Sequence, residues 1–230
     1  MFESKTEDRV LAAAGEVFAE VGYRAATLRE ICRRAQANIA AVNYHFHDKE
    51  QLYSAVLQQA VMAAGEGLAQ LAPPAALGAE EKLRHFIGRF LHNLLGVDRP
   101  ARLLRLWAHE MLEPTPALDV AVEISVRPVN RILSQIVEEL LGPAAATATI
   151  RDCTGSILSQ CASYQQCSVV VARVDQIDVH DPATIDRLAE HVFQFSLGGI
   201  RAVALRTVCS GRRADGSLQA LSGDPSLRSG

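Results

Sequence analysis

Three helix-start signals lie close together in the chain, at Thr27, Asn38 and Asp48. Threonine, asparagine and aspartate side chains accept hydrogen bonds from the free backbone N–H groups of a helix's first turn, so each is a favoured N-cap. The helix that Asn38 opens can run only from Ile39 to about His45 before the next cap. Because so short a helix cannot bury a core of its own, it has to pack on its neighbours and leave one face exposed.

Helical spacing continues along almost the whole chain. Apolar residues recur at intervals of three and four, and no stretch sustains the apolar–polar alternation of a strand. The first helix, which includes Phe18, is expected to end at Gly22, because glycine is suited to a left-handed C-cap. We therefore predict an all-α fold. Beyond the cap at Asp48, further helices are predicted over residues 83–94, 100–107, 116–140, 145–172 and 183–207.

The segment 72–79, APPAALGA, interrupts the helical pattern with two prolines and a glycine, and it is the best candidate for a domain boundary. We predict an N-terminal three-helix helix-turn-helix domain over residues 1–50 and a connecting helix over about 48–71. A larger helical domain for ligand binding and dimerisation is predicted over 72–207. Residues 208–230 are rich in serine and glycine and lack periodicity, which predicts a mobile tail.

Several classes of protein are disfavoured by the residues that the chain lacks. The five cysteines are scattered and never form a CxxC pair, so neither a disulfide framework nor a zinc site is predicted. Nucleophile-elbow, phosphate-loop and dinucleotide-binding motifs are missing, and we predict no enzyme activity, no catalytic residue, no cofactor and no metal. The scattered cysteines favour a reducing cytoplasm. Because the chain starts with acidic residues and has no long uncharged apolar window, neither a signal peptide nor a membrane span is predicted.

The two helices on either side of Gln36–Asn38 have the separation of a helix-turn-helix, whose second helix enters the major groove of DNA. Polar side chains there can bond phosphates and base edges, and small residues permit close approach to the DNA backbone. We expect the inward-facing residues of the short helix to come from Ala40, Val42 and Phe46. The residues predicted to contact DNA are Thr27, Arg29, Asn38, Ala41, Asn43, Tyr44, His45 and Lys49.

Net charge gives no support to a DNA-binding role. The formal net charge is −3, and residues 1–60 contain seven Lys and Arg against eight Asp and Glu. Lys49 is more informative, because it follows the cap Asp48 in the first turn of a helix, where the helix dipole disfavours a cation by about 0.3–1 kcal/mol. A nearby phosphate would offset that cost. We therefore predict phosphate contacts for Lys49 and Tyr44, whereas His45 could instead cap or pack locally.

The run Ala35–Tyr53, AQANIAAVNYHFHDKEQLY, resembles the DNA-binding signature of TetR-type transcriptional regulators. The preceding run Ala13–Thr27 resembles the first helix and turn of that family, so the resemblance covers about the first 55 residues. It implies a helix-turn-helix reader of DNA. Two positions depart from the pattern: Ala40 stands where many members have glycine, and Asn43 where many have an aromatic residue. The base preference of the family therefore does not carry over.

A second run, Glu110–Asp119 (EMLEPTPALD), together with Arg127–Pro128 and Gln160, is similar to the C-terminal domain of the CecR (YbiH-like) branch of the same family. This resemblance implies a homodimer that responds to a ligand and usually acts as a repressor. The expected partners are a double-stranded DNA operator, an unidentified small-molecule effector and a second copy of the chain, with no membrane.

Candidate ligand and dimer residues come from the helices of the second domain. Apolar residues with a few polar neighbours are typical of ligand pockets, although most such stripes are core. The ligand candidates are Phe86, Phe90, Leu103, Trp107, Glu110, Met111, Gln160 and Tyr164. Small residues on the last two helices allow close packing between two copies or within one chain. The dimer candidates are Gly155, Ser159, Ala162, Phe195, Gly198, Gly199 and Ala202.

The leading functional prediction is a homodimeric regulator whose affinity for a pseudo-palindromic operator is set by a small molecule. One alternative is a binding protein or enzyme with an all-helical pocket, although the sequence nominates no substrate. Another keeps the DNA reader and gives the second domain a protein partner, in which case that domain should be tightly filled rather than hollow.

Overall fold

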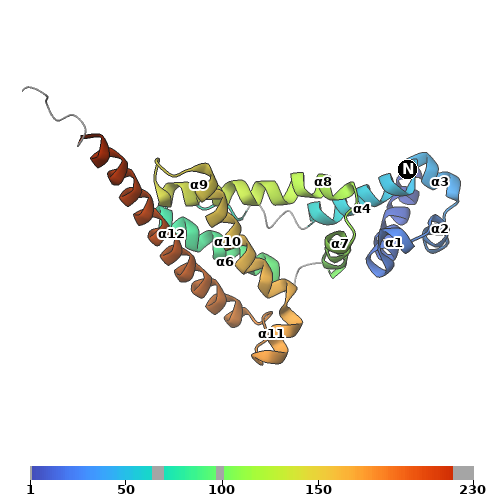
Figure 1. Cartoon of the computed structure of the whole chain (residues 1–230). Helices are drawn as coiled ribbons and strands as arrows, with labels where there is room; N and C mark the ends of the chain where they lie inside the picture. The colour runs from blue at the N-terminus through green and yellow to red at the C-terminus, as the bar shows by residue number, and fades with distance from the viewer. Residues whose placement is uncertain (1, 64–69, 97–100, 220–230) are drawn as a thin grey trace, which may run out of the picture. The chain divides into compact units, whose positions relative to one another are not determined.

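The computed structural model in Figure 1 describes residues 2–63, 70–96 and 101–219, and every regular element within these ranges is helical. The all-α prediction is therefore confirmed for the part of the chain that is described. In chain order the elements are α1 (Phe2–Ala25), α2 (Leu28–Ala35), α3 (Ile39–Phe46), α4 (Lys49–Ala63), α6 (Ala79–Leu95), α7 (Ala101–Leu112), α8 (Ala117–Ala121), η1 (Val122–Val126), α9 (Arg127–Leu141), α10 (Thr147–Gln166), α11 (Ser168–Val174) and α12 (Pro182–Gln219).

The three predicted caps form the hydrogen bonds that the sequence suggests. The Thr27 hydroxyl accepts from the Glu30 backbone N–H at 3.2 Å and begins α2. The Asn38 amide oxygen accepts from the backbone N–H of Ala40 at 3.0 Å and begins α3. The Asp48 carboxylate accepts from a backbone N–H of the first turn of α4 at 2.8 Å. These side chains satisfy backbone donors that have no partner within their own helix.

Gly22 breaks the regular helix of α1, as its predicted role as a helix terminator requires. Its backbone has φ 76° and ψ 173°, a conformation that only glycine adopts readily. A β-carbon at this position would also lie 2.9 Å from Nδ1 of His109 on α7. Both the backbone and the neighbouring ring therefore require glycine here.

The chain divides into two compact units, of which the first comprises residues 1–72 and 92–132. Its core combines the first four helices with α7 and α8, and Phe18, Tyr53 and Leu106 are among its fully buried side chains. The rings of Phe18 and Tyr53 meet edge to face with centroids 4.8 Å apart. Helices that the sequence assigned to the second domain thus share a core with the N-terminal helices.

The second unit comprises residues 73–91 and 133–230, and it begins next to the predicted boundary at Ala72. Its core contains side chains from α6, α9, α10 and α12, including Phe86, Leu133, Cys161 and Phe193. Ion pairs between helices surround this core. They are Lys82–Glu139, Arg84–Glu190 and Arg201–Glu80.

The helix expected over 116–140 is present as a continuous helical run over 117–141, made of α8, η1 and α9. Its middle is a π-helical turn, η1, which a 3.6-residue pattern does not reveal because a π-turn contains one more residue. Three other local predictions were wrong. The helix expected over 145–172 is interrupted at Cys167, where neither glycine nor proline marks the break. Ala40 is exposed rather than inward-facing. The last helix does not end at Thr207, because α12 continues to Gln219.

The predicted tail, 208–230, therefore begins inside α12. The sequence has no proline between Pro182 and Pro225, and serine and glycine disfavour a helix far less than proline does. Residues 220–230 lie outside the described residues, as does the predicted helix start at Pro100. The mobility of the tail stays a prediction. Across the described helices, none combines the length and apolar character that crossing a membrane requires.

Replacing Gly22 with alanine should lower the free energy of unfolding by about 1–3 kcal/mol, since alanine is strained at this φ and ψ and its β-carbon would meet His109. Chemical denaturation monitored by circular dichroism would measure the change. Gly88→Ala is the matched control, because a β-carbon there meets nothing within 4 Å inside α6. That control should leave stability unchanged or raise it slightly. Equal effects at the two sites would contradict the strain at Gly22.

Candidate nucleic-acid interface

The short helix α3 is fixed on one side and open on the other. Val42 and Phe46, one turn apart, are its two buried residues and anchor it to the core of the first unit. On the opposite side Asn43 is exposed, and Tyr44 is 71% exposed. The helix therefore presents a polar and aromatic surface that its packing and its cap hold in place.

The other predicted contact residues at the start of α2 and α3 differ in how free they are. Arg29 is exposed on the first turn of α2, and Ala41 is half-buried on α3. Thr27 and Asn38 are exposed, but each has an oxygen that accepts the capping hydrogen bond of its helix. If Thr27 and Asn38 contact DNA, they do so while their side-chain oxygens also accept the capping hydrogen bonds.

His45 is mostly enclosed by its own neighbours. Its side chain is 13% exposed, and its Nδ1 lies 3.9 Å from a carboxylate oxygen of Glu7 on α1. The ring also packs against the rings of Tyr44 and Phe46. These contacts favour the local packing role over a direct contact with bases, and its role in DNA binding stays a prediction.

Lys49 has internal partners that the sequence could not reveal. Its Nζ donates a hydrogen bond to the Arg24 carbonyl oxygen at 3.2 Å and lies 4.6 Å from the centre of the Tyr23 ring. Burial lowers the pKa of Lys49. The carbonyl and the ring offset the unfavourable helix dipole, so the position of this cation does not by itself require a phosphate. A phosphate contact stays a prediction.

Nearby arginines are paired with carboxylates. Arg33 donates to the two carboxylate oxygens of Glu30 at 2.8 and 2.7 Å, and Arg34 makes a similar pair of bonds to Glu20. The hydrogen bonds from Arg33, followed by the one from Arg34, lower the pKa of Glu30 to about 2. The charges of Arg33 and Arg34 are therefore partly neutralised within the protein.

Ile39, which is 51% exposed in the first turn of α3, is not among the residues that the sequence predicts to contact DNA. An exposed apolar side chain at this position is suited to contact a thymine methyl group. Helical spacing places Ile39 on the same face as the buried Phe46, seven residues later, so periodicity could not have identified it.

The predicted ligand residues are divided between the two units. Leu103 and Trp107 pack in the core of the first unit, where Glu110 is buried and Met111 is exposed. The other candidates belong to the second unit, and their surroundings also differ. The rings of Phe86 and Phe90 stack with centroids 5.6 Å apart, Gln160 donates to the Ser156 carbonyl oxygen, and Tyr164 lines a hollow.

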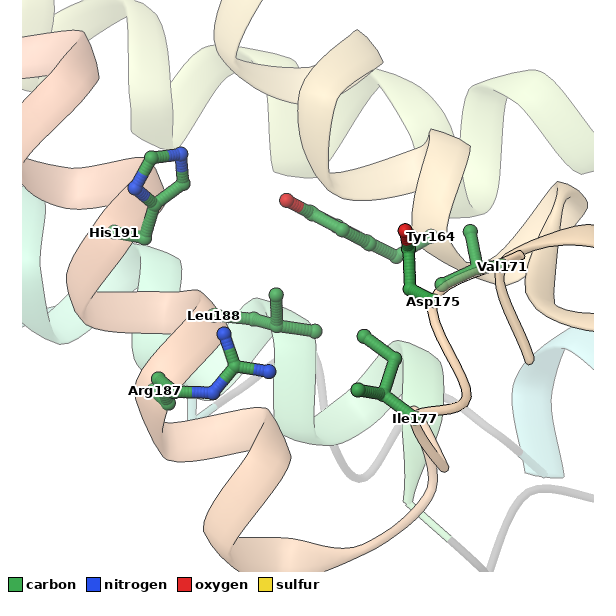
Figure 2. A pocket seen from close by; sticks show the side chains of 7 residues that line it. All are labelled: Tyr164, Val171, Asp175, Ile177, Arg187, Leu188 and His191. Atoms are coloured by element: carbon green, nitrogen blue, oxygen red, sulfur yellow. The ribbon is translucent and has the colours of Figure 1, made fainter. Parts of the chain in front are cut away.

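That hollow lies in the second unit between α10, α11 and the first turns of α12, and Figure 2 shows the Tyr164 hydroxyl directed across it toward His191. Its volume is about 360 Å³, at the lower end of the range for small-molecule sites. Apolar and hydrogen-bonding side chains both line it. They are Tyr164, Val171, Asp175, Ile177, Arg187, Leu188 and His191.

Six of the seven predicted dimer residues are exposed on α10 and α12, and Phe195 is the largest of them, with 66% of its surface exposed. Ala162 is half-buried. The two helices contact each other within the second unit. Their exposed residues are Gly155, Ser159, Phe195, Gly198, Gly199 and Ala202.

The described cysteines, histidines and carboxylates are not arranged as a metal site, and two of the cysteine thiols are buried. Among the residues that the structure describes, no three His, Cys, Asp or Glu side chains gather closely enough to hold a metal ion. Burial raises the pKa of the Cys161 thiol to about 12 and also raises the pKa of Cys32. These two thiols are poorly disposed to react as thiolates.

A capped helix that is buried on one face, exposed on the other and preceded by a second helix across a tight turn defines the helix-turn-helix class of DNA-binding proteins. Residues 10–56 match the family model of bacterial regulatory proteins of the tetR family. Residues 79–200 match the C-terminal domain of the HTH-type transcriptional dual regulator CecR. The chain belongs to the TetR family and has a CecR-type C-terminal domain.

A curated relative, the HTH-type transcriptional dual regulator CecR of Shigella flexneri, is 32% identical over 147 residues, which are 60% of this chain and 66% of that protein. The match thus spans just under two thirds of the relative's length. A TetR-family regulator from Streptomyces coelicolor has a TM-score of 0.59 at 15% identity, covering 86% of this chain and 96% of that structure. A regulator from Rhodococcus sp. Rha1 has a TM-score of 0.58 at 18% identity, with 84% and 96% covered. Both solved structures share the fold of this chain.

Replacing Tyr44 or Lys49 with alanine should separate DNA contact from structural support. Tyr44→Ala should weaken DNA binding with little loss of stability, because the side chain is exposed. Lys49→Ala should also lower the free energy of unfolding, since it removes the bond to Arg24 and the contact with Tyr23. If Lys49 contacts a phosphate, the slope of log K against log salt should become shallower by about 0.9.

Binding titrations at several salt concentrations and chemical denaturation would measure these effects. Lys82→Ala is a suitable control, because this lysine pairs with Glu139 within the second unit. An unchanged salt slope combined with reduced stability would assign Lys49 a structural role alone.

Proposed function

We propose that the chain is a sequence-specific DNA-binding regulator, a repressor that leaves a pseudo-palindromic operator when a small molecule binds. The observation that carries the proposal is the outward face of α3, where Asn43 and Tyr44 are exposed while Val42 and Phe46 are buried. Amide and phenol groups on such a helix can bond base edges and phosphates. Membership of a family of transcriptional regulators supports the DNA-binding part of the proposal.

A homodimer is the second part of the proposal. The exposed ring of Phe195 lies on the same helix as Gly198 and Gly199, and a β-carbon at either glycine would meet nothing within 4 Å. Small residues allow helices to approach closely, so α10 and α12 can pack against the same helices of a second copy. The two readers of such a dimer would meet two half-sites one or more helical turns apart.

Selection of bound DNA from a random pool tests the proposal directly. At low salt the wild-type chain should enrich an inverted repeat, because a two-fold dimer presents the same reader twice. Failure to enrich any sequence would exclude the proposed DNA-binding role. Enrichment of a single, unrepeated half-site would instead contradict the dimer.

Phe195→Glu should convert the dimer to a monomer, because it places a charge in the centre of the proposed apolar interface. Sedimentation velocity would measure the mass, and operator affinity should fall with it. Met62→Glu, which replaces an exposed apolar residue of the first unit, is the control and should leave the mass unchanged. A Phe195→Glu variant that stays dimeric would place the interface elsewhere.

The third part of the proposal concerns the effector, for which the hollow of the second unit is the best candidate site. Leu188, Val171 and Ile177 supply apolar surface, while Arg187 and Tyr164 supply hydrogen-bond donors. A guanidinium can bind a small amphipathic carboxylate through two hydrogen bonds, and such a ligand would have to keep its charge beside Arg187 and away from Asp175, which also lines the hollow. Binding would release the operator only if the ligand favours a conformation with lower DNA affinity.

Benzoate and octanoate are simple aromatic and aliphatic probes of this site. At least one should raise the melting temperature of the wild-type chain, and Arg187→Ala should reduce the shift. Arg173→Ala is the matched control, because this exposed arginine lies on α11 and does not line the hollow. If the melting temperature shifts equally in both variants, the hollow is not the effector site.

A further inference from the structure

A buried carboxylate joins three segments of the first unit. Glu110 of α7 is fully buried, and its two carboxylate oxygens accept three hydrogen bonds. The Tyr53 hydroxyl donates to Oε1 at 2.7 Å, and the Thr115 hydroxyl donates to the same oxygen at 2.9 Å. The Thr115 backbone N–H donates to Oε2 at 3.0 Å. Among the side chains that the structure describes, Glu110 is the one buried residue with a formal charge.

Tyr53 connects this carboxylate to the DNA-reading helices. It lies on α4, which follows α3 directly after the cap at Asp48. Its ring is buried between Phe18 and Tyr23 of α1, with centroids 4.8 and 5.0 Å away. Burial, reinforced by the bond to Glu110, raises the pKa of the Tyr53 phenol, so its hydroxyl stays a donor at neutral pH.

Hydrogen bonds fix orientation more strictly than apolar contacts do. An apolar surface tolerates small shifts, whereas a hydrogen bond weakens steeply once its angle falls below about 120°. A buried carboxylate also cannot exchange a lost protein donor for water without being exposed, so each of its donors is costly to remove. Glu110 therefore favours one relative position of α4, α7 and the turn that contains Thr115.

An exposed ion pair connects α1 to the residue that follows α7. Arg24 pairs with Glu113 at 3.3 Å, and both side chains are more than half exposed. Ion pairs of this kind contribute little to orientation, because water competes for both partners. The hydrogen bond between the buried side chains of Tyr53 and Glu110 therefore connects α4 to α7 at a place where water does not compete for either partner.

We propose that Glu110, Tyr53 and Thr115 are positioning residues that fix the orientation of the DNA reader and thereby set the half-site spacing that the dimer accepts. This inference rests on the proposed function. The turn that carries Thr115 leads into α8 and η1, and α9 continues directly from η1. The residues of α9 are divided between the first unit and the unit proposed to dimerise.

A rigid reader discriminates strongly between spacings, since only one separation of half-sites meets both copies at once. A loosely held reader can adjust to half-sites at other spacings. It loses more conformational entropy when it binds the preferred spacing, which weakens that binding. Loosening the cluster should therefore change two quantities together. The affinity for the selected operator falls, and the discrimination against operators of other spacings weakens.

Tyr53→Phe is the sharpest test, because it removes the hydroxyl and keeps the ring. The affinity for the operator selected from the random pool should fall about ten-fold or more, the effect of one lost hydrogen bond to a charged group. Operators with one base pair inserted or deleted between the half-sites should lose less affinity, so the wild-type preference for the selected spacing should become smaller. Titrations well below the melting temperature, with folding checked by circular dichroism, would measure both.

Tyr23→Phe is the matched control, since Tyr23 belongs to the same aromatic cluster and makes no bond to Glu110. It should preserve both affinity and spacing preference. Glu110→Gln, which puts an amide donor where acceptors are needed, should reproduce the effect of Tyr53→Phe without adding fully to it. If Tyr53→Phe lowers the melting temperature but keeps the spacing preference of the wild type, the cluster is structural only and the inference is wrong.

A measurement without DNA separates this inference from the proposed function. Spin labels encoded at the exposed positions Glu16 and Arg131, both in the first unit, report the distance between α1 and α9 within one chain. Labelled chains would be diluted with unlabelled protein. The distance distribution should broaden in Tyr53→Phe and not in Tyr23→Phe. Equal widths would overturn the positioning role even if the wild type selects an operator, and failure of selection alone would overturn only the proposed function.

Discussion

The burial of Val42 and Phe46 is the interaction on which the DNA-reading surface depends. A helix of eight residues has no appreciable stability in water, so α3 persists only because these side chains are held in the core and Asn38 caps its first turn. The same anchoring decides which residues face outward. Exposure of Asn43 and Tyr44 is thus a consequence of the packing on the other face.

The core that anchors α3 extends well beyond the N-terminal helices. Leu103 and Leu106 of α7 and Ala117 of α8 are buried in the same cluster as Phe18 and Val42. A change in the position of α7 or α8 therefore acts on the surroundings of the reader directly. The first unit is better described as a reader built together with its own supporting helices than as an independent module with a linker.

Local features of the fold could be predicted from the sequence, and long-range ones could not. The caps at Thr27 and Asn38 depend on residues no more than three positions away, and all-α architecture follows from spacing that repeats along the chain. The partners of Lys49 and Glu110 are distant in sequence, at Arg24 and Tyr53. No periodicity encodes such contacts, so Lys49 suggested a phosphate and Glu110 a ligand, while each has a partner inside the protein.

The positive charges of the reader are largely paired within the protein, and this affects how it can recognise DNA. Arg33, Arg34 and Lys49 all have partners within the first unit, so binding a phosphate would compete with existing contacts. Electrostatic attraction that is already satisfied internally adds little to nonspecific affinity, which depends on uncompensated cations. Neutral groups on α3 have no such competition, because Tyr44 is exposed and Asn43 lies beside it. Under the proposed function, a reader built in this way would gain relatively more from the correct bases than from phosphate contacts by these three cations.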